Sequence, residues 1–121
     1  MVWLINDLAA MAYAIPFLGS EAFAIIQTGR PVNEARISVV SAGTGLGQAF
    51  LVPEKNGKYI ILDSEGGHCD FAPRNELESE LLFFLQKKYS RVSIECVLSG
   101  PGLLDIYKFF ITKHAELEAI Y

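Results

Sequence analysis

The amino-acid sequence predicts an α+β arrangement in which a meander of antiparallel strands is followed by helices. Three short apolar runs, at residues 37–40, 48–52 and 59–62, have the length and composition of strands. The turn between the last two runs contains Asn56-Gly57, a strong hairpin signal. After the strands, leucines recur four residues apart from Leu77 to Leu85, which is the spacing of a packed helix face.

The first part of the chain predicts a strand, a helix and a loop. Val2–Ile5 is a run of bulky apolar residues, which predicts a strand buried on both faces. Leu8–Ala14 favours a helix, and Pro16 is expected to kink or end it because proline restricts the residue before it. Proline, asparagine and mixed charge between residues 29 and 35 predict a surface loop ahead of the meander.

The last third of the chain predicts helices. Asn75 is expected to cap the helix that carries the leucine stripe. Ser93 is expected to cap a short helical turn, and the Gly-Pro-Gly sequence at residues 100–102 is expected to break it. Residues 103–111 are then apolar enough for another helix, and residues 114–121 also favour helix.

The composition excludes several classes of protein. The chain has 10 basic and 14 acidic side chains, and the basic residues are scattered, so a nucleic-acid binder with a clustered cationic face is not expected. The longest uncharged run, Leu8–Ser20, has 13 residues, whereas a membrane-spanning helix needs about 20. Cys69 and Cys96 have neither metal nor redox spacing, so we expect reduced thiols in a cytoplasmic protein.

The mean hydropathy of +0.30 is high for a free-standing soluble domain. Two interpretations stay open. Either some apolar surface is covered by a partner or by further chain, or the core is simply dense.

Gly43, Gly45 and Gly47 alternate along the turn between the first two strands of the meander. Glycine lets the backbone approach a ligand closely, so such a loop suits phosphate or sugar oxygens. A dinucleotide-binding fingerprint is excluded because it requires a helix after the glycines, where residues 48–52 favour a strand. The alternative is a plain glycine-rich hairpin.

Two carboxylates stand beside predicted apolar elements. Asp7 follows the first predicted strand, where a carboxylate can accept a proton from a hydroxyl nucleophile or can instead cap the helix. Glu95 lies between apolar neighbours, where a carboxylate is costly unless it is paired or faces a polar cleft. Glu95 can also be a first-turn acid that interacts with a helix dipole.

The sequence Glu65-Gly66-Gly67-His68 follows the third strand of the meander. A carboxylate and an imidazole on an open backbone can hydrogen-bond the hydroxyls of a polyol, while His68 can equally be an ordinary loop histidine. Metal binding by Glu65, His68, Cys69 and Asp70 is a further alternative, although neighbours in an extended chain point to opposite sides.

Four motifs, Ile5–Asp7, Ala42–Gly47, Glu65–Pro73 and Glu95–Leu103, together resemble the bacterial-type glucokinases. Their order and intervals match across nearly the whole chain. The resemblance implies an α/β fold of the ribonuclease H-like, or actin-like ATPase, type, with two lobes that close over a cleft. It implies ATP-dependent phosphorylation of glucose at the 6-hydroxyl, a step of glycolysis, with ATP and Mg²⁺ as cosubstrates.

The resemblance also implies roles for individual residues. Asp7 would be the general base that receives the proton of the 6-hydroxyl, and such a base contributes about 10²- to 10⁴-fold. The other hydroxyls of the sugar would be held by Asn6, Glu65, His68 and Glu95. The residues facing the phosphates would be Gly43, Thr44 and Gly45, and no metal-binding residue is implied.

By the same resemblance, residues 1–19 correspond to the end of the small-lobe strand and the interlobe helix, and residues 20–121 to the first part of the large lobe. The family's glycine-rich phosphate loop and adenosine segment are not found, so the chain resembles an internal part of a glucokinase. We expect these 121 residues alone to show negligible turnover and at best weak glucose binding. Open sheet edges would also favour a homodimer or another edge-paired assembly.

Two other classes of function fit some of the same residues. A sugar-sensing or assembly module would keep the binding residues without catalysis, and it predicts sugar binding without turnover. A small metal-dependent hydrolase using Glu65, His68 and Asp70 predicts stoichiometric zinc or manganese in the purified protein.

Overall fold

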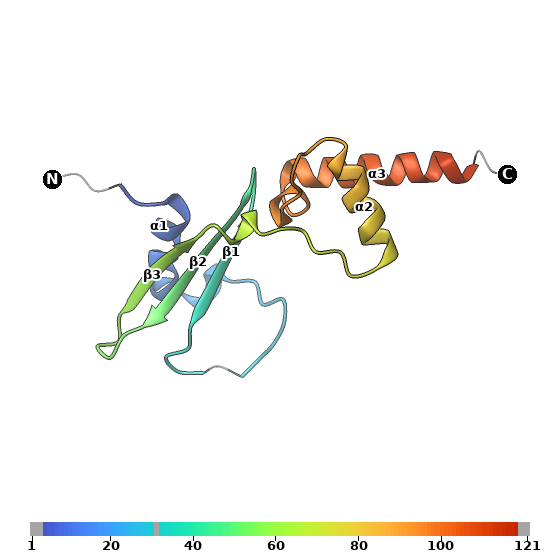
Figure 1. Cartoon of the computed structure of the whole chain (residues 1–121). Helices are drawn as coiled ribbons and strands as arrows, with labels where there is room; N and C mark the ends of the chain where they lie inside the picture. Colours follow the sequence, from blue (N-terminus) through green and yellow to red (C-terminus); the bar gives the residue numbers. More distant parts are fainter. Residues whose placement is uncertain (1–3, 31, 119–121) are drawn as a thin grey trace. The chain divides into compact units, whose positions relative to one another are not determined.

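The computed structural model describes residues 4–30 and 32–118. Three strands precede two long helices, as the sequence predicts (Figure 1). The helices and strands are α1 (Asp7–Ala14), β1 (Ile37–Ala42), β2 (Leu46–Pro53), β3 (Tyr59–Ser64), α2 (Glu76–Gln86) and α3 (Gly100–Glu118). Short 3₁₀ turns are η1 (Ile15–Phe17), η2 (Ser20–Ala22), η3 (Gly66–His68) and η4 (Ile94–Cys96).

The chain divides into two compact units. The first comprises the described residues up to Val40 together with Gln48–Ser64, and the second comprises Ser41–Gly47 together with the described residues from Glu65 onward. The loop between β1 and β2 therefore belongs to the second unit, although the bodies of both strands belong to the first. None of the described helices combines the length and apolar character that crossing a bilayer requires.

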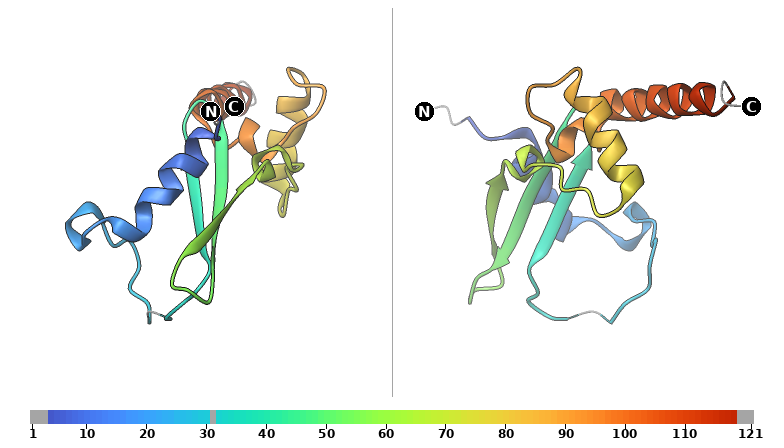
Figure 2. Two further views of the ribbon diagram at one scale, coloured as in Figure 1. Left: turned by 90° about the vertical axis from the view of Figure 1, so that its left-hand side faces the viewer. Right: turned by 45° about the vertical axis from the view of Figure 1, so that its right-hand side comes forward.

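The first unit is a three-stranded sheet with α1 packed on one face (Figure 2). The strand order is β1-β2-β3, and β2 runs antiparallel to β3. Gly57 has a φ of +75° in the turn between them, which explains the Asn-Gly signal at this position. Because side chains alternate across a strand, Ala49 and Leu51 of β2 share one face, where they pack against Leu8 and Ala12 of α1.

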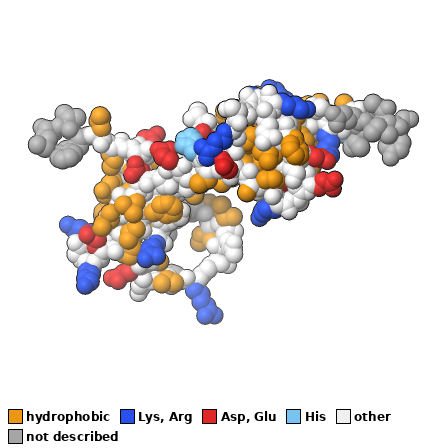
Figure 3. Space-filling view, in the orientation of Figure 1, with side chains coloured by type: hydrophobic (Ala, Val, Ile, Leu, Met, Phe, Trp, Pro, Cys, Tyr) orange, Lys and Arg blue, Asp and Glu red, His pale blue; other side chains and the backbone are white. Residues whose placement is uncertain are grey.

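The other face of the sheet is also apolar. Phe50 pairs with Leu62 and lies 37% exposed, and Ile60 of β3 is 46% exposed. Apolar side chains gather over the strands in the space-filling view (Figure 3). The high mean hydropathy therefore reflects apolar side chains left on the surface as well as a core.

The prediction of a buried strand at Val2–Ile5 is wrong where the structure describes it. Leu4 and Ile5 form no strand and are 98% and 56% exposed, while Val2 and Trp3 lie outside the described residues. A strand needs a neighbour to pair with, and no described strand pairs with this segment. The helix that follows ends at Ala14 as predicted, and Pro16 lies in the 3₁₀ turn η1.

The second unit is built on α2 and α3. The Asn75 side chain caps α2 as predicted, accepting a hydrogen bond from the Glu78 amide at 2.9 Å. Leu81 and Leu85 are buried against Phe109 of α3. Leu77 was predicted to belong to the packed face of the helix, but it is 43% exposed. It lies in the first turn of α2, outside this apolar cluster.

The prediction that residues 100–102 separate two helical segments is wrong only in its place: the short turn η4 ends at Cys96, whereas Gly100 begins α3, which continues to Glu118. Pro101 is tolerated because the first amides of a helix have no intrahelical acceptor. Gly102 is required by packing: a Cβ there would stand 2.5 Å from the carbonyl oxygen of Val97. The two helices predicted over residues 103–111 and 114–121 are one helix as far as Glu118.

A buried carboxylate joins α3 to the end of α2. Asp105, 2% exposed, accepts hydrogen bonds from Lys88 Nζ at 2.7 and 2.9 Å and from the Tyr89 hydroxyl at 2.7 Å. The Lys88 hydrogen bond lowers the pKa of Asp105, and the Tyr89 hydroxyl adds to this effect against the opposing effect of burial. The Asp105 hydrogen bond in turn raises the pKa of Lys88.

Asp105→Asn is therefore expected to destabilise the chain at neutral pH by about 1.5–3 kcal/mol, the range for hydrogen bonds to charged groups. A carboxyl whose folded pKa is lowered stabilises the protein above its unfolded pKa, and this contribution is lost as the pH falls through the folded pKa. Urea unfolding of both proteins between pH 7 and pH 2 tests this. The gap in unfolding free energy should close in acid, and a gap independent of pH would contradict the assignment.

Candidate functional site

Two carboxylates and a histidine converge in the second unit. His68 Nε2 lies 3.4 Å from Glu65 Oε2, and His68 Nδ1 lies 3.9 Å from Glu95 Oε1. Glu65 immediately precedes η3, His68 ends η3, and Glu95 is the middle residue of η4. We call these three residues the acid–histidine cluster. The side chains of Glu65, His68 and Glu95 are 83%, 59% and 32% exposed respectively, so the cluster is open to a ligand.

The glycine loop, residues 43–46, lies against this cluster. The Leu46 amide donates to Glu95 Oε2 at 2.8 Å, across 49 positions of sequence. The loop is closed by the Gly43 amide, which donates to the Gly45 carbonyl at 2.8 Å. The loop is also hydrogen-bonded to the start of α3, because the Gly100 amide donates to the Gly43 carbonyl at 2.8 Å. Thr44 is exposed at the tip.

At two positions here a side chain would have no room unless a neighbouring group moved. A Cβ at Gly67 would overlap the Leu46 carbonyl oxygen and stand 3.1 Å from the Leu46 Cβ. A Cβ at Gly45 would stand 3.0 Å from Glu95 Cδ and closer still to its Oε2. Gly43 has nothing within 4 Å of its Cβ position, so packing does not require glycine there.

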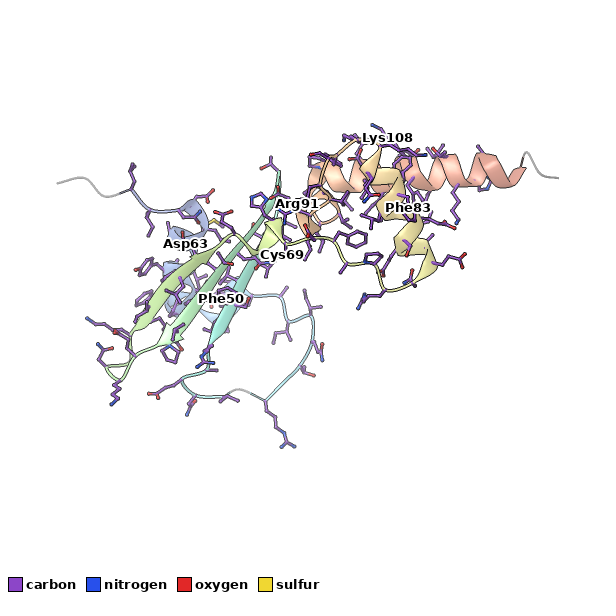
Figure 4. All side chains as sticks on the ribbon, in the orientation of Figure 1. Phe50, Asp63, Cys69, Phe83, Arg91 and Lys108 are labelled. Atoms are coloured by element: carbon purple, nitrogen blue, oxygen red, sulfur yellow. The ribbon has the colours of Figure 1, made fainter. Side chains whose placement is uncertain are left out.

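The segments that carry His68 and Glu95 are fixed to each other by backbone hydrogen bonds. Asp70 and Ser93 form an isolated antiparallel bridge, in which the Ile94 amide donates to the Cys69 carbonyl at 2.9 Å. Arg91 spans the same two segments (Figure 4): its Nε donates to Asp70 Oδ1 at 2.5 Å and its Nη2 to the His68 carbonyl at 3.0 Å. These contacts place η3 and η4 side by side.

The role of Arg91 and the hydrogen bond from the Leu46 amide to Glu95 were not predicted from the sequence. Both depend on contacts between residues more than 20 positions apart, which no local pattern signals.

Asn6 and Asp7 lie at the start of α1, in the first compact unit. Asn6 is the helix cap, and its Oδ1 accepts from the Ala9 amide at 3.0 Å. Capping therefore occupies the amide oxygen and leaves the Nδ2 donors facing solvent, since Asn6 is exposed. Asp7 is the first helical residue, also exposed, and its Oδ1 accepts from the Leu8 amide at 2.7 Å.

The structure gives no support to a metal centre at Glu65, His68, Cys69 and Asp70. Within residues 4–30 and 32–118, no group of three or more histidine, cysteine, aspartate or glutamate side chains could hold a metal ion. Asp70 Oδ1 is instead engaged by Arg91.

A separate cavity of about 350 Å³ lies between α2 and α3. Phe83, Phe84 and Phe109 line it together with Lys87 and Lys113. No predicted site residue lines this cavity, so it is distinct from the acid–histidine cluster.

A model of the glucokinase family matches residues 1–120. The chain belongs to the glucokinase family. The glucokinase of Synechocystis sp. is 47% identical over 118 residues, covering 96% of this chain and 33% of its own length. The glucokinase of Nostoc sp. is 50% identical over 118 residues, with coverage of 96% and 34%. This glucokinase-family chain therefore spans about a third of the length of these relatives.

Solved glucokinase structures confirm the predicted fold class. The glucokinase of an Antarctic psychrotroph is 40% identical with a TM-score of 0.81, covering 92% of this chain and 34% of its own. The glucokinase of Balamuthia mandrillaris, solved in complex with glucose, is 24% identical with a TM-score of 0.78 and coverage of 92% and 35%. At that identity the second likeness concerns the fold alone.

Proposed function

We propose that this chain supplies the sugar-binding part of a kinase that transfers the γ-phosphoryl group of ATP to the 6-hydroxyl of glucose. The observation that carries the proposal is the convergence of Glu65, His68 and Glu95 in one solvent-accessible cluster beside the glycine loop. Membership of the glucokinase family supports the same reaction.

The chemistry of the cluster suits a polyol. Ionised carboxylates accept hydrogen bonds from hydroxyls, and an imidazole can donate one and accept another. The cluster thus offers acceptors from Glu65 and Glu95 on either side of the His68 ring, and Asn6 would add its Nδ2 donors. A site built to hydrogen-bond hydroxyls discriminates strongly, because a sugar that lacks a partner leaves a polar group unpaired.

Asp7 would act as the general base. Its carboxylate is exposed at the first residue of α1, where it can accept the proton of the 6-hydroxyl as that oxygen attacks the γ-phosphorus. The bond between the γ-phosphorus and the bridging oxygen of ATP breaks in the same transfer, and ADP leaves.

The exposed glycine loop would face the phosphates of ATP through Gly43, Thr44 and Gly45. Gly43 and Thr44 are exposed, so backbone and a hydroxyl are accessible to phosphate oxygens. Mg²⁺ neutralises charge on those oxygens when it binds.

The lobe assignment is part of the same proposal. Residues 1–19 would end the small lobe and connect the two lobes, and residues 20–121 would begin the large lobe. We place the protein in the cytoplasm.

A chimera tests the function. The part of this chain that aligns with the Synechocystis glucokinase, 96% of its residues, would replace the aligned stretch of that protein, with which it is 47% identical over 118 residues. We expect the chimera to form ADP when given glucose and ATP, to discriminate against galactose, and to depend on Mg²⁺. The 121-residue chain alone is the matched control, with negligible turnover expected.

Two outcomes would contradict the proposal. A folded chimera that binds no glucose would show that this chain does not supply a sugar site. A folded chimera that binds glucose but transfers no phosphoryl group would favour the non-catalytic sugar-binding module instead.

A further inference from the structure

Gly45 is required by the carboxylate it faces. A Cβ at this position would overlap the end of the Glu95 side chain, so no larger residue fits while Glu95 keeps its place. The backbone of Gly45 does not have a positive φ, so its conformation alone does not call for glycine. The requirement comes from the approach of Glu95.

The residue after Gly45 binds the same carboxylate oxygen. The Leu46 amide donates to Glu95 Oε2 at 2.8 Å, and a hydrogen bond to a charged acceptor is about twice as strong as a neutral one. With Oε2 held in this way, Oε1 remains on the side of His68, 3.9 Å from Nδ1. The loop therefore sets which oxygen of Glu95 is available to a ligand.

We propose that Gly45 and the Leu46 amide form a seat that positions Glu95 for the sugar. Gly45 is then a positioning residue of the hexose site, in addition to any contact of the loop with phosphate. This inference rests on the proposed function, because it assigns the seated carboxylate to a sugar hydroxyl.

A seated carboxylate has a clear advantage in binding. A glutamate side chain that is free in solvent must lose rotamer freedom when it binds a ligand, whereas one already held by a backbone amide has lost most of it. The low exposure of Glu95 relative to Glu65 and His68 agrees with this difference in mobility. Displacing Glu95 from its seat should therefore weaken sugar binding without unfolding the protein.

Gly45→Ala is expected to affect the fold little, because the group that must move is the end of a side chain and not the backbone. The Cβ of an alanine at residue 45 would overlap the end of a flexible side chain, so Glu95 can rotate aside. We expect the melting temperature of Gly45→Ala to stay close to that of the wild type, and its glucose affinity to fall.

The first experiment is a double-mutant cycle in the chimera. Glucose dissociation constants are measured for wild type, Gly45→Ala, Glu95→Asp and the double variant. Misplacement by about 1 Å costs up to about 10²-fold, so Gly45→Ala should raise the glucose Kd by about 10- to 10²-fold. Aspartate is one methylene shorter, so its carboxylate should no longer meet a Cβ at residue 45. Adding Gly45→Ala to Glu95→Asp should therefore change the glucose Kd little.

Gly29→Ala is the matched control, because its Cβ position has nothing within 4 Å and its glucose Kd should not change. If Gly45→Ala costs the same glucose affinity whether or not Glu95→Asp is also present, the seat is overturned. A loss confined to ATP affinity would also overturn it, because the glycine would then serve the phosphate alone.

The second experiment separates this inference from the proposed function. Amide exchange of Leu46 is followed by NMR in the 121-residue chain without sugar, for wild type and Glu95→Gln. The seat predicts faster exchange in the variant, and unchanged exchange would overturn it. If Leu46 exchanges faster in Glu95→Gln but the wild-type chimera binds no glucose, the proposed function is refuted. The role of the seat in sugar binding is then refuted with it.

Discussion

Replacement of Asp7 by asparagine should lower the kcat of the chimera for glucose phosphorylation by about 10²- to 10⁴-fold, the contribution of a positioned general base. Asparagine has nearly the same shape as aspartate, but its amide cannot take the proton of the 6-hydroxyl. The helix should be unaffected, because the cap of α1 is the Asn6 side chain and not Asp7.

The measurement is a steady-state comparison of Asp7→Asn with the unmodified chimera, with melting temperature and glucose affinity recorded for both. A loss in kcat at similar melting temperature and similar glucose affinity is the result expected of a base. An unchanged kcat would remove Asp7 from the chemistry, and a loss explained entirely by weaker glucose binding would make it a binding residue.

Gly67→Ala should destabilise the chain by about 2–3 kcal/mol or more, at the upper end of the cost of overpacking. The Cβ would overlap the backbone carbonyl oxygen of Leu46, which cannot swing aside as a side chain can. To make room, η3 must move away from the glycine loop, and His68 moves with it.

Urea unfolding of the 121-residue chain measures this effect, and Gly43→Ala is the matched control. The Cβ position of Gly43 has nothing within 4 Å, so this control should be neutral or stabilising by about 0.4–1 kcal/mol. Equal unfolding free energies for Gly67→Ala and Gly43→Ala would show that η3 does not pack on Leu46 as described.

Local patterns predicted most of the fold. The Asn56-Gly57 turn, the Asn75 cap and the apolar strand at residues 48–52 each depend on residues within a few positions, and the structure confirms all three. The errors arose where neighbours in space decide the outcome. Leu4 and Ile5 have strand composition but no strand to pair with, and the glycine at residue 102 serves a close approach rather than a helix break.

The candidate site was predictable only in part, for the same physical reason. Glu65 and His68 are three residues apart, so their proximity follows from the local sequence. The contact of Glu95 with the Leu46 amide spans 49 positions, and that of Arg91 with Asp70 spans 21. Such contacts are set by the packing of η3 and η4, which a single sequence does not reveal.

The most direct test of the account is whether glucose contacts the ring of His68. The imidazole nitrogens of the ¹⁵N-histidine-labelled chimera are followed by NMR as glucose is added, with His68 assigned from a His68→Gln variant and His114 as an internal reference. We expect a saturable shift of the His68 nitrogens that weakens in Glu95→Gln, with no shift at His114. Glucose phosphorylation by a chimera whose His68 nitrogens do not respond to the sugar would contradict it.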